Sequence, residues 1–516
     1  MPHDRALRIA CLAVTAAATV LTAYVSIRWG AFAIGGSDSH CYAGQARMFA
    51  EGRLSLPPPV VPPVPWPNAA ATFAPSGFAQ GTDPDGASVP LCAAGLAVAM
   101  AAVMRVAGDA GIFAVVPLTG ILAVWSTFVL GRRLSGPVAG AASAALIACS
   151  PIFLYQIVQP MSDVPTAALW TAALAMAVGP AGDSRRSVAC GVSAGLLTGA
   201  AIMMRPNLLP LAVIPALLAL PSRPAAMSVI GGAAPGVAAV ALLQAAMHGS
   251  PFRSGYGDLG QLFSAANLST NLANYPAWLA SAHSPVLGLG LLAPFVAGRP
   301  RAAWALTAFA AGVLALYLPY VPFTDWWYSR FMLPALPVLI VLTVIVLERA
   351  ACLLPSRAGL ATLAVIIAAL GGFWLHRGDA LSVFRLRDLE QKYVELGRLA
   401  SDRLPRNAIV LAAQPAGSVR YYARLPTLSW DAIDPAWLDR VLAECRTRGL
   451  TPYLAIESWE MEAFRSRFRR QSAVAELDWP PRASLGYVIF VYDPADRDRY
   501  LAGERVSTEH VMWGRR

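Results

Sequence analysis

Two acidic residues stand where a membrane protein could carry out chemistry on a substrate with a lipid tail and a polar head. Asp38 follows Gly35 and Gly36, just after the first long apolar segment, and Asp163 lies between two later ones. An acid at the end of a membrane helix marks a candidate functional site. The alternative for both residues is helix capping: Asp38 for a helix starting near Ser39, and Asp163 for the helix that contains Pro165.

Two arginines are expected on the same side of the membrane as these acids. Arg205 precedes Pro206, and the break at this proline lets its guanidinium extend to the outer surface. Arg330 opens a later apolar segment, and guanidinium pairs well with phosphate, which is the anion of lipid head groups. Both are therefore predicted to bind a donor phosphate. The alternative for Arg330 is a partner in Asp325 or in ordinary head groups.

Several aromatic and amide side chains are predicted to contact a substrate: Tyr42, Tyr256, Asn274, Trp278 and Trp327. Three of them lie in a predicted outer loop, residues 248–284. Flat rings that stack on sugars and amides that bind hydroxyls are typical of carbohydrate sites. The alternative is that they anchor the chain at the membrane surface, where tryptophan and tyrosine are also enriched.

The composition identifies an integral membrane protein. Of its 516 residues, 56% are hydrophobic and only 14% are charged, against about 25% in soluble domains. The net charge of +10 suits basic cytoplasmic loops and anionic lipid, so no nucleic-acid partner is indicated. Membrane lipids are the expected surroundings.

The seven cysteines are scattered, without the paired spacing of a zinc site. No cofactor and no metal site are predicted from them, and a role for a divalent ion is left open. Cys41 and Cys92 could face the oxidising side and pair with each other; free thiols are the alternative.

The fold class predicted is an all-α polytopic membrane protein with a small α/β domain at the C-terminus. Arg5 and Arg8 precede the first apolar segment, which places the N-terminus in the cytoplasm. Residues 91–107 are apolar, but the later basic loops become cytoplasmic only if this stretch dips into the membrane without crossing it. Eleven spans follow from hydropathy: residues 9–28, 111–131, 136–154, 164–180, 187–204, 207–221, 226–247, 285–297, 302–320, 332–348 and 358–376.

Two domains are predicted. Residues 1–380 form the membrane domain, with a large outer loop at 31–90 that contains an amphipathic run, Cys41 to Leu54, and a proline-rich stretch. An odd number of spans places residues 385–516 outside. Strands are predicted at 407–412, 452–456 and 487–492, and a helix at 434–448. With no phosphate-binding loop or catalytic triad, this domain is interpreted as a lid or docking module.

The motifs resemble those of the GT-C glycosyltransferases, over roughly residues 1–376. The resemblance rests on the acid after the first span, the run from Tyr42-Ala43 to Gly52, the turn Met161-Ser162-Asp163-Val164-Pro165, Arg205-Pro206-Asn207, and the stretch from Ser329 to Pro337. The most similar branch contains protein O-mannosyltransferases, the aminoarabinose transferases of lipid A and rhizobial lipopolysaccharide enzymes.

This resemblance implies an inverting transferase with a polyprenyl-phosphate sugar as donor and a lipid, glycan or protein as acceptor on the outer face. Asp38 would be the general base, Asp163 would orient a substrate, and Arg330 would hold the leaving phosphate. Many relatives carry a second acid where this chain has Ser39, and Pro-Pro-Gly where it has Cys92 to Gly95. The competing interpretations are a flippase for lipid-linked sugars and a non-catalytic scaffold. The acids lie at span ends, and ionisable residues near span centres, which a transporter would need, are lacking.

Overall fold

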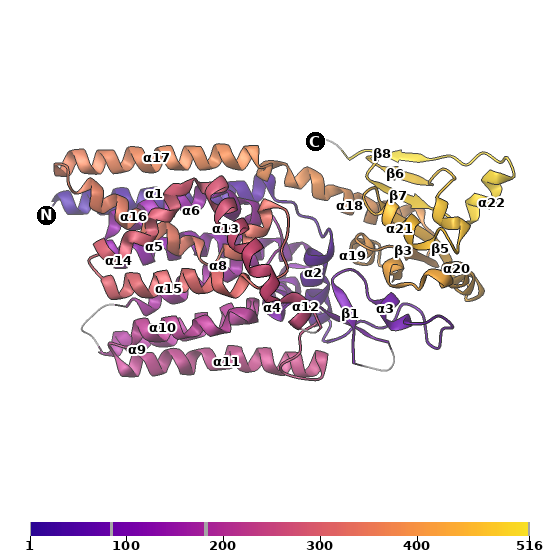
Figure 1. The fold of residues 1–516 in the computed structure, drawn as a ribbon, viewed down its shortest axis with the longest axis horizontal. Helices are drawn as coiled ribbons and strands as arrows, with labels where there is room; N and C mark the ends of the chain where they lie inside the picture. Colours follow the sequence, from indigo (N-terminus) through magenta and orange to yellow (C-terminus); the bar gives the residue numbers. More distant parts are fainter. Residues whose placement is uncertain (1, 83–85, 180–183, 258, 514–516) are drawn as a thin grey trace.

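The computed structural model describes residues 2–82, 86–179, 184–257 and 259–513. The chain is elongated, with a bundle of long helices at one end and a domain built on a β-sheet at the other (Figure 1). Part of residues 31–90 lies at their junction, whereas α13 (Leu268–His283), which follows the short helix α12 (Leu259–Leu262), packs on the bundle. The predicted fold class is confirmed.

Every predicted span is mainly helical where the structure describes it, although several contain a break or end before the predicted boundary. The bundle consists of these helices: α1 (Pro2–Trp29), α5 (Val115–Ser135), α6 (Pro137–Cys149), α7 (Pro151–Ile157), α8 (Asp163–Ala177), α9 (Ser184–Met204), η2 (Pro206–Ala212), α10 (Val213–Ala219), α11 (Arg223–His248), η4 (Pro285–Leu292), α14 (Ala293–Val296), α15 (Pro300–Tyr317), η5 (Trp326–Met332), α16 (Leu336–Ala351) and α17 (Ser356–Ala380). Residue 180, at the end of one predicted span, lies outside the described residues.

Fewer helices reach the length of a membrane span than the eleven apolar segments that hydropathy indicates. Among the described residues, six helices are long and apolar enough to span a membrane, or nine if each bent pair of helices counts as one span. The remaining two predicted spans coincide with α8, of 15 residues, and with the short pair η2–α10. Proline explains much of the bending, because it cannot continue the backbone hydrogen-bond pattern of a helix.

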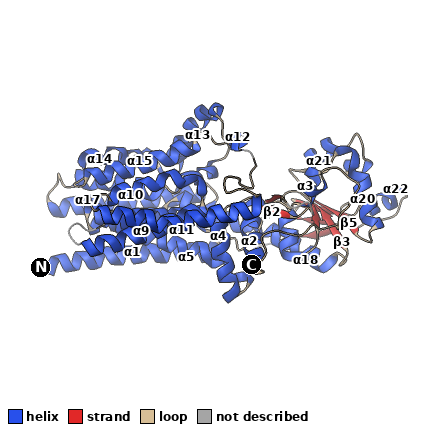
Figure 2. Ribbon diagram, turned by 90° about the horizontal axis from the view of Figure 1, so that it is seen from below, coloured by secondary structure: helices blue, strands red, loops and turns tan. Residues whose placement is uncertain are grey.

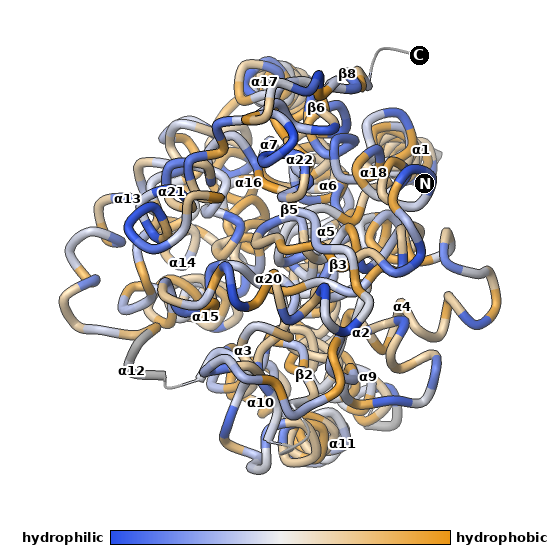
Figure 3. Tube along the Cα trace, turned by 90° about the vertical axis from the view of Figure 1, so that its right-hand side faces the viewer, coloured by the Kyte–Doolittle hydropathy of each residue, from blue (hydrophilic) through white to orange (hydrophobic). Residues whose placement is uncertain are grey.

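The bundle has a buried interior and an apolar exterior. Nearly the whole of α8 is buried among α5, α9 and α16. Large apolar side chains such as Val20, Leu242 and Val365 remain exposed on the outer helices, which is expected of surfaces that face lipid. Figure 3 looks along the long axis, and orange apolar segments recur around the periphery of the bundle.

Glycine brings α9 and α11 into close contact. Gly191, Gly195 and Gly199 repeat every four residues along α9, and a β-carbon at Gly195 would overlap backbone atoms of α11. On the facing helix a β-carbon at Gly236 would overlap the backbone of Gly199. Small residues at this spacing let membrane helices pack backbone against backbone. The pair therefore forms a rigid unit that ends next to Arg205.

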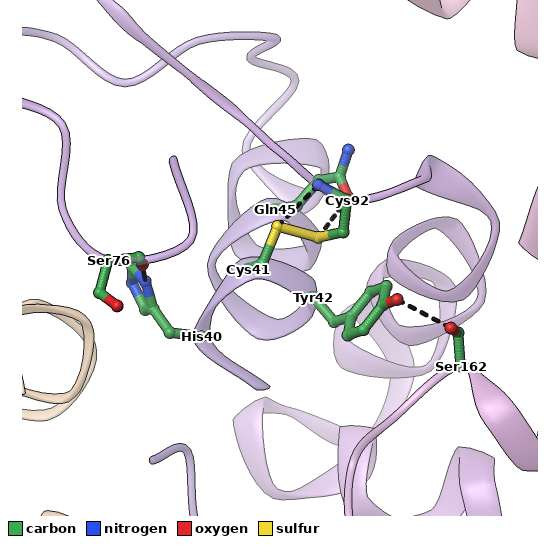
Figure 4. Close-up of a disulfide and its surroundings, with 7 residues drawn as sticks. All are labelled: His40, Cys41, Tyr42, Gln45, Ser76, Cys92 and Ser162. Atoms are coloured by element: carbon green, nitrogen blue, oxygen red, sulfur yellow. Dashed lines mark hydrogen bonds between the residues drawn. A yellow bond between two sulfur atoms is a disulfide. The ribbon is translucent and has the colours of Figure 1, made fainter. Parts of the chain in front are cut away.

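Residues 31–90 are more ordered than their composition indicates. They contain α2 (Ser37–Ala50), α3 (Ala69–Phe73) and an antiparallel hairpin of β1 (Phe78–Gln80) and β2 (Ser88–Pro90). The 14-residue apolar helix α4 (Ala94–Ala107) follows, and it is too short to cross a bilayer, as predicted for residues 91–107. A disulfide joins Cys41 in α2 to Cys92, just before α4 (Figure 4). Of the two alternatives for these cysteines, pairing is the one observed.

Residues 248–284 differ from the expected loop, because α13 occupies their second half. A bend of 108° separates the helical segment that ends at His283 from the one that starts at Pro285. The Asn271 amide donates hydrogen bonds to the carbonyls of Leu318 and Tyr320, at 2.9 and 2.6 Å. These bonds hold α13 across the outer end of α15.

The C-terminal domain is a six-stranded mixed sheet with helices around it (Figure 2). The strand order is β4-β3-β5-β7-β6-β8. The strands are β3 (Ala408–Leu411), β4 (Thr427–Leu428), β5 (Thr451–Glu457), β6 (Ala483–Leu485), β7 (Ile489–Tyr492) and β8 (Glu509–Val511). The helices are α18 (Leu386–Arg403), α19 (Ala416–Ser418), the π-helical turn η7 (Val419–Ala423), α20 (Leu438–Thr447), α21 (Met461–Phe468) and α22 (Ala495–Leu501).

The three strands predicted in this domain correspond to β3, β5 and β7, and the predicted helix corresponds to α20. Strands β4, β6 and β8, which have two or three residues each, are not predicted from the sequence. Strands this short contain too few positions to show a hydrophobic period.

Candidate active site

Asp38 lies in the first turn of α2 and forms an ion pair with Arg330 of η5. Arg330 Nη2 donates to Asp38 Oδ2 at 2.8 Å. The Asp38 side chain is 47% exposed, and that of Arg330 is 15% exposed. Asp38 therefore does not cap α2, which starts at Ser37 after Gly36 without a side-chain cap. Arg330 has its partner in Asp38, and Asp325 accepts a hydrogen bond from Thr324 instead.

Asp163 and Arg205 form a second ion pair, which is buried. Arg205 Nη2 lies 2.5 Å from Asp163 Oδ1; the Asp163 side chain is fully buried and that of Arg205 is 11% exposed. The expectation that Arg205 extends to the outer surface is wrong, because a buried carboxylate holds it inside the protein. Asp163 is the first residue of α8, where the helix dipole favours a negative charge. No hydrogen bond from the described residues reaches its second oxygen, Oδ2.

An aromatic side chain connects the two ion pairs. Phe331 lies 5.3 Å from the guanidinium carbon of Arg205 and 5.3 Å from that of Arg330, measured to the ring centroid. Its ring stacks on Tyr317 at 4.9 Å, and the Tyr317 hydroxyl accepts a hydrogen bond from Arg205 at 3.1 Å. Cation–π contacts of this kind stabilise guanidinium groups. The two arginines are therefore placed by one aromatic cluster.

Tyr42 ties α2 to the start of α8. Its hydroxyl lies 2.8 Å from the Ser162 hydroxyl, next to Asp163. Figure 4 shows Tyr42 pointing toward Ser162, while His40 points to the opposite side of α2, toward Ser76. Burial raises the pKa of Tyr42 to about 12, so its hydroxyl stays protonated near neutral pH. Tyr42 therefore belongs to the same site as both carboxylates.

Two of the other predicted substrate contacts lie near this site. Tyr256 is 44% exposed, but partial desolvation of its phenol still raises its pKa, and the charges of Asp38 and Arg330 also act on it. Trp327, three residues before Arg330, stacks on Tyr155 at 6.5 Å and meets Trp326 at 6.4 Å. Both residues are partly exposed, so their rings are accessible to a ligand.

The structure does not bring Asn274 and Trp278 to this site. The Asn274 amide donates to the Phe323 carbonyl at 3.3 Å. Trp278 packs edge-to-face on Tyr275, with ring centroids 5.7 Å apart. Both side chains take part in holding α13 to its neighbours. Tyr317 and Phe331 are not predicted from the sequence as members of this site. Phe331 lies within the stretch from Ser329 to Pro337 that carries the resemblance, whereas nothing in the sequence distinguishes Tyr317.

The carboxylates of the site do not fit a divalent cation. Each of them has a guanidinium as its partner, so a metal would meet two positive charges close to its ligands. Within residues 2–82, 86–179, 184–257 and 259–513, three or more His, Cys, Asp or Glu side chains nowhere come together as a metal site would need.

Comparison with known proteins identifies the fold. No protein-family model and no curated protein sequence matches this chain. ArnT from Cupriavidus metallidurans, solved with undecaprenyl phosphate bound, aligns over 89% of this chain and 95% of its own, with a TM-score of 0.56 and 12% identity. The oligosaccharyltransferase AglB from Archaeoglobus fulgidus, solved with an inhibitory peptide and a dolichol-phosphate, aligns over 91% of this chain and 72% of its own (TM-score 0.56, 13% identity).

The chain has the GT-C fold. The mycobacterial arabinofuranosyltransferase AftD is also similar, over 87% of this chain and 35% of its own, with a TM-score of 0.51 and 14% identity. These alignments extend beyond the bundle, since they cover most of the 516 residues. A GT-C fold with at least six apolar helices makes this a multi-pass membrane protein.

Proposed function

We propose that this protein is a membrane glycosyltransferase that moves a sugar from a polyprenyl-phosphate donor to an acceptor hydroxyl, with inversion at the anomeric carbon. The observation that carries the proposal is the half-exposed Asp38 carboxylate beside Arg330, at the end of a bundle with the GT-C fold. The similar structures were solved with undecaprenyl phosphate and with a dolichol-phosphate, which supports a lipid phosphate as the donor head. The acceptor is a lipid, a glycan or a protein.

The chemistry needs one base and one cation, and the site offers both. Asp38 takes the proton of the acceptor hydroxyl as the oxygen attacks the anomeric carbon. The bond between that carbon and the phosphate oxygen breaks, and its electron pair leaves on the phosphate. Arg330 stabilises this charge, because guanidinium binds phosphate through charge-assisted hydrogen bonds. Arg330 thus pairs with the Asp38 carboxylate before the donor binds, and it binds the leaving phosphate during the transfer.

The second pair supports this step from inside the protein. Arg205 adds positive potential near the leaving phosphate, and Asp163 fixes its position through the buried ion pair. Tyr256 and Trp327, which are partly exposed, and Tyr42, which lies next to Asp163 through Ser162, are the proposed contacts for the sugar. In the membrane topology that we propose, the N-terminus is cytoplasmic and residues 385–516 lie outside the cytoplasm.

The test is transfer from a panel of labelled polyprenyl-phosphate sugars to membrane extracts by purified wild-type protein and by Asp38→Asn. We expect the variant to lose about 10²- to 10⁴-fold in rate, the usual contribution of a general base. Asp109→Asn is the matched control, because Asp109 is also an exposed acid paired with an arginine, Arg47 at 2.6 Å. It should transfer at the wild-type rate.

Two outcomes would contradict the proposal. Wild-type rates in Asp38→Asn would remove Asp38 as the base and leave Asp163 as the remaining carboxylate. The absence of transfer by the wild-type protein across the whole panel would favour a flippase or a scaffold with this fold.

A further inference from the structure

The segment between α1 and α2 determines where Asp38 lies, yet it has no regular structure of its own. Residues 30–36 form neither helix nor strand, and Phe32 and Gly36 have positive φ angles of 45° and 40°. Backbone groups in such a segment need partners from elsewhere, because unpaired buried N–H and C=O groups are costly. What holds this segment therefore also holds Asp38, two residues beyond Gly36.

Val158 of the bundle accepts a hydrogen bond from the Ala31 N–H at 2.8 Å, and other partners come from the C-terminal domain. The Ile34 N–H donates to the Tyr422 hydroxyl at 2.7 Å, and Ile34 itself is fully buried. The Gln391 amide donates to the Ala31 carbonyl at 2.8 Å, and Arg387 donates to the Arg28 carbonyl at 3.2 Å. Three hydrogen bonds across more than 350 residues of sequence thus fix the end of α1 and the turn before α2.

The glycines of this turn press directly on the same domain. A β-carbon at Gly35 would collide with the ring of Tyr393 and the carboxylate of Glu390. A β-carbon at Gly36 would collide with the amide of Gln414. This close approach explains why the turn before Asp38 consists of two glycines.

The helix that presents these side chains is itself fixed to the sheet. Glu457, at the end of β5, is fully buried and accepts hydrogen bonds from Lys392 at 2.6 Å and from Tyr393 at 2.5 Å. Both donors lie on α18, next to Gln391. On the other side of α2, Gly417 of α19 packs against the His40 ring. The C-terminal domain therefore holds α2 and the turn before it from two directions.

We propose that Tyr422 is a positioning residue for the transfer reaction, and that through it the C-terminal domain sets the place of the Asp38 carboxylate. The domain is then a working part of the active site rather than a separate lid or docking module. This inference rests on the proposed function for its kinetic prediction, and the hydrogen bond at Ile34 gives it an independent test.

The experiment compares Tyr422→Phe with Tyr421→Phe in the full-length protein. The first substitution removes the acceptor of the Ile34 N–H. The second removes a neighbouring buried hydroxyl that is not the acceptor of the Ile34 N–H, so it is a matched control. We expect Tyr422→Phe to lower kcat about 10-fold while the donor KM stays within twofold, because misplacing a reacting group slows the chemical step. Tyr421→Phe should match the wild type in both constants.

Hydrogen exchange of the peptide that covers residues 30–42 provides the readout that does not depend on activity. Exchange there should become faster in Tyr422→Phe and stay unchanged in Tyr421→Phe. If Tyr422→Phe does not fold, Gln391→Met tests the same contact from α18, because it removes the donor to Ala31 with little change in volume.

The results separate this inference from the proposed function. An unchanged kcat in Tyr422→Phe, an effect confined to KM, or equal losses in both tyrosine variants would overturn the positioning role. If the wild-type protein transfers no sugar at all, the proposed function has failed, and the exchange data still decide on the contact. Faster exchange only in Tyr422→Phe would then support the contact between the domain and the turn, and unchanged exchange would refute it.

Discussion

The two ion pairs of the site have the same chemistry and opposite surroundings. Asp38–Arg330 lies at the surface of the site with a half-exposed carboxylate, whereas Asp163–Arg205 is enclosed, with a carboxylate that water cannot reach. An exposed pair contributes little to stability, and its members are free to exchange partners. A buried pair is costly to break, because the remaining charge stays unsolvated. The first pair is therefore suited to react, and the second to hold the framework.

The largest effect on stability is expected at the buried pair. Asp163→Ala leaves the Arg205 guanidinium buried without its counter-charge and should lower the free energy of unfolding by about 3–5 kcal/mol. Thermal unfolding in detergent measures the change. Adding Arg205→Met should restore part of the loss, because the unpaired charge is then removed. A loss below about 1 kcal/mol in the single variant would mean that the pair is solvated and that the comparison fails.

The position of Asp38 in the exposed pair depends on a disulfide, because the disulfide fixes the helix that carries this residue. Removing the disulfide between Cys41 and Cys92 with serine at both positions should cost about 2–4 kcal/mol and lower transfer, because α2 carries Asp38. Unfolding and transfer are measured side by side. Cys352→Ser is the control, since this cysteine is free and exposed. Equal melting temperatures for the disulfide variant and the control would contradict the anchoring role.

A third carboxylate, Glu390, gives the seam between the domains a dependence on pH. Burial, reinforced by the charge of Glu457 and opposed by Lys392, raises the pKa of Glu390 to about 7. An acid whose pKa is raised by folding binds more protons in the folded state. The free energy of unfolding therefore falls as the pH rises from about 4.3, the pKa of a glutamate in the unfolded chain, to about 7, the pKa of Glu390 in the folded protein.

Glu390→Gln should remove this part of the pH dependence. The variant should be more stable than the wild type at pH 8, by about 3 kcal/mol, and similar to it at pH 4. Unfolding of both proteins across this range is the measurement. Glu395→Gln, on the same helix but paired with Arg398 at 2.6 Å near the surface, is the control and should change little. If the wild-type protein became more stable between pH 5 and pH 7 and Glu390→Gln did not, the pKa of Glu390 would be lowered by folding. That result would contradict the raised pKa.

The smallest effect sharpens the comparison most. Asp38→Asn should change the free energy of unfolding by less than about 1 kcal/mol, because the carboxylate it replaces is half-exposed and the asparagine oxygen can still accept a hydrogen bond from Arg330. The same unfolding assay detects this, and together with a large loss of transfer it would separate reactivity from stability at one residue. A destabilisation as large as that of Asp163→Ala would show that both pairs are structural.

Much of this organisation could be predicted from the sequence, for a physical reason. Apolar runs identify membrane helices, and acids or arginines at their ends stand out against an apolar background, which singled out Asp38, Asp163, Arg205 and Arg330. Which acid meets which arginine could not be predicted, because the pairs join residues 42 and 292 positions apart. The arginine buried next to Asp163 was misjudged for the same reason.

The seam with the C-terminal domain was out of reach of sequence reasoning. Tyr422 and Gln391 lie in an amphipathic region and belong to no recognisable motif. Their partners are backbone groups of Ile34 and Ala31, and backbone groups are the same at every position of a sequence. The polar residues of α13 were misread because amides and aromatic rings suit both sugars and tertiary contacts. Asn274 proved to serve the latter.

The disulfide between Cys41 and Cys92 has a consequence for how α2 and α4 move. Cys92 leads into α4, where a β-carbon at Gly95 would overlap the backbone of Met203 and Met204, directly before Arg205. A covalent and steric path thus runs from the helix of Asp38 to the buried arginine. The disulfide couples α2 to α4, so a displacement of either helix is transmitted to the other, and this coupling exists only under oxidising conditions.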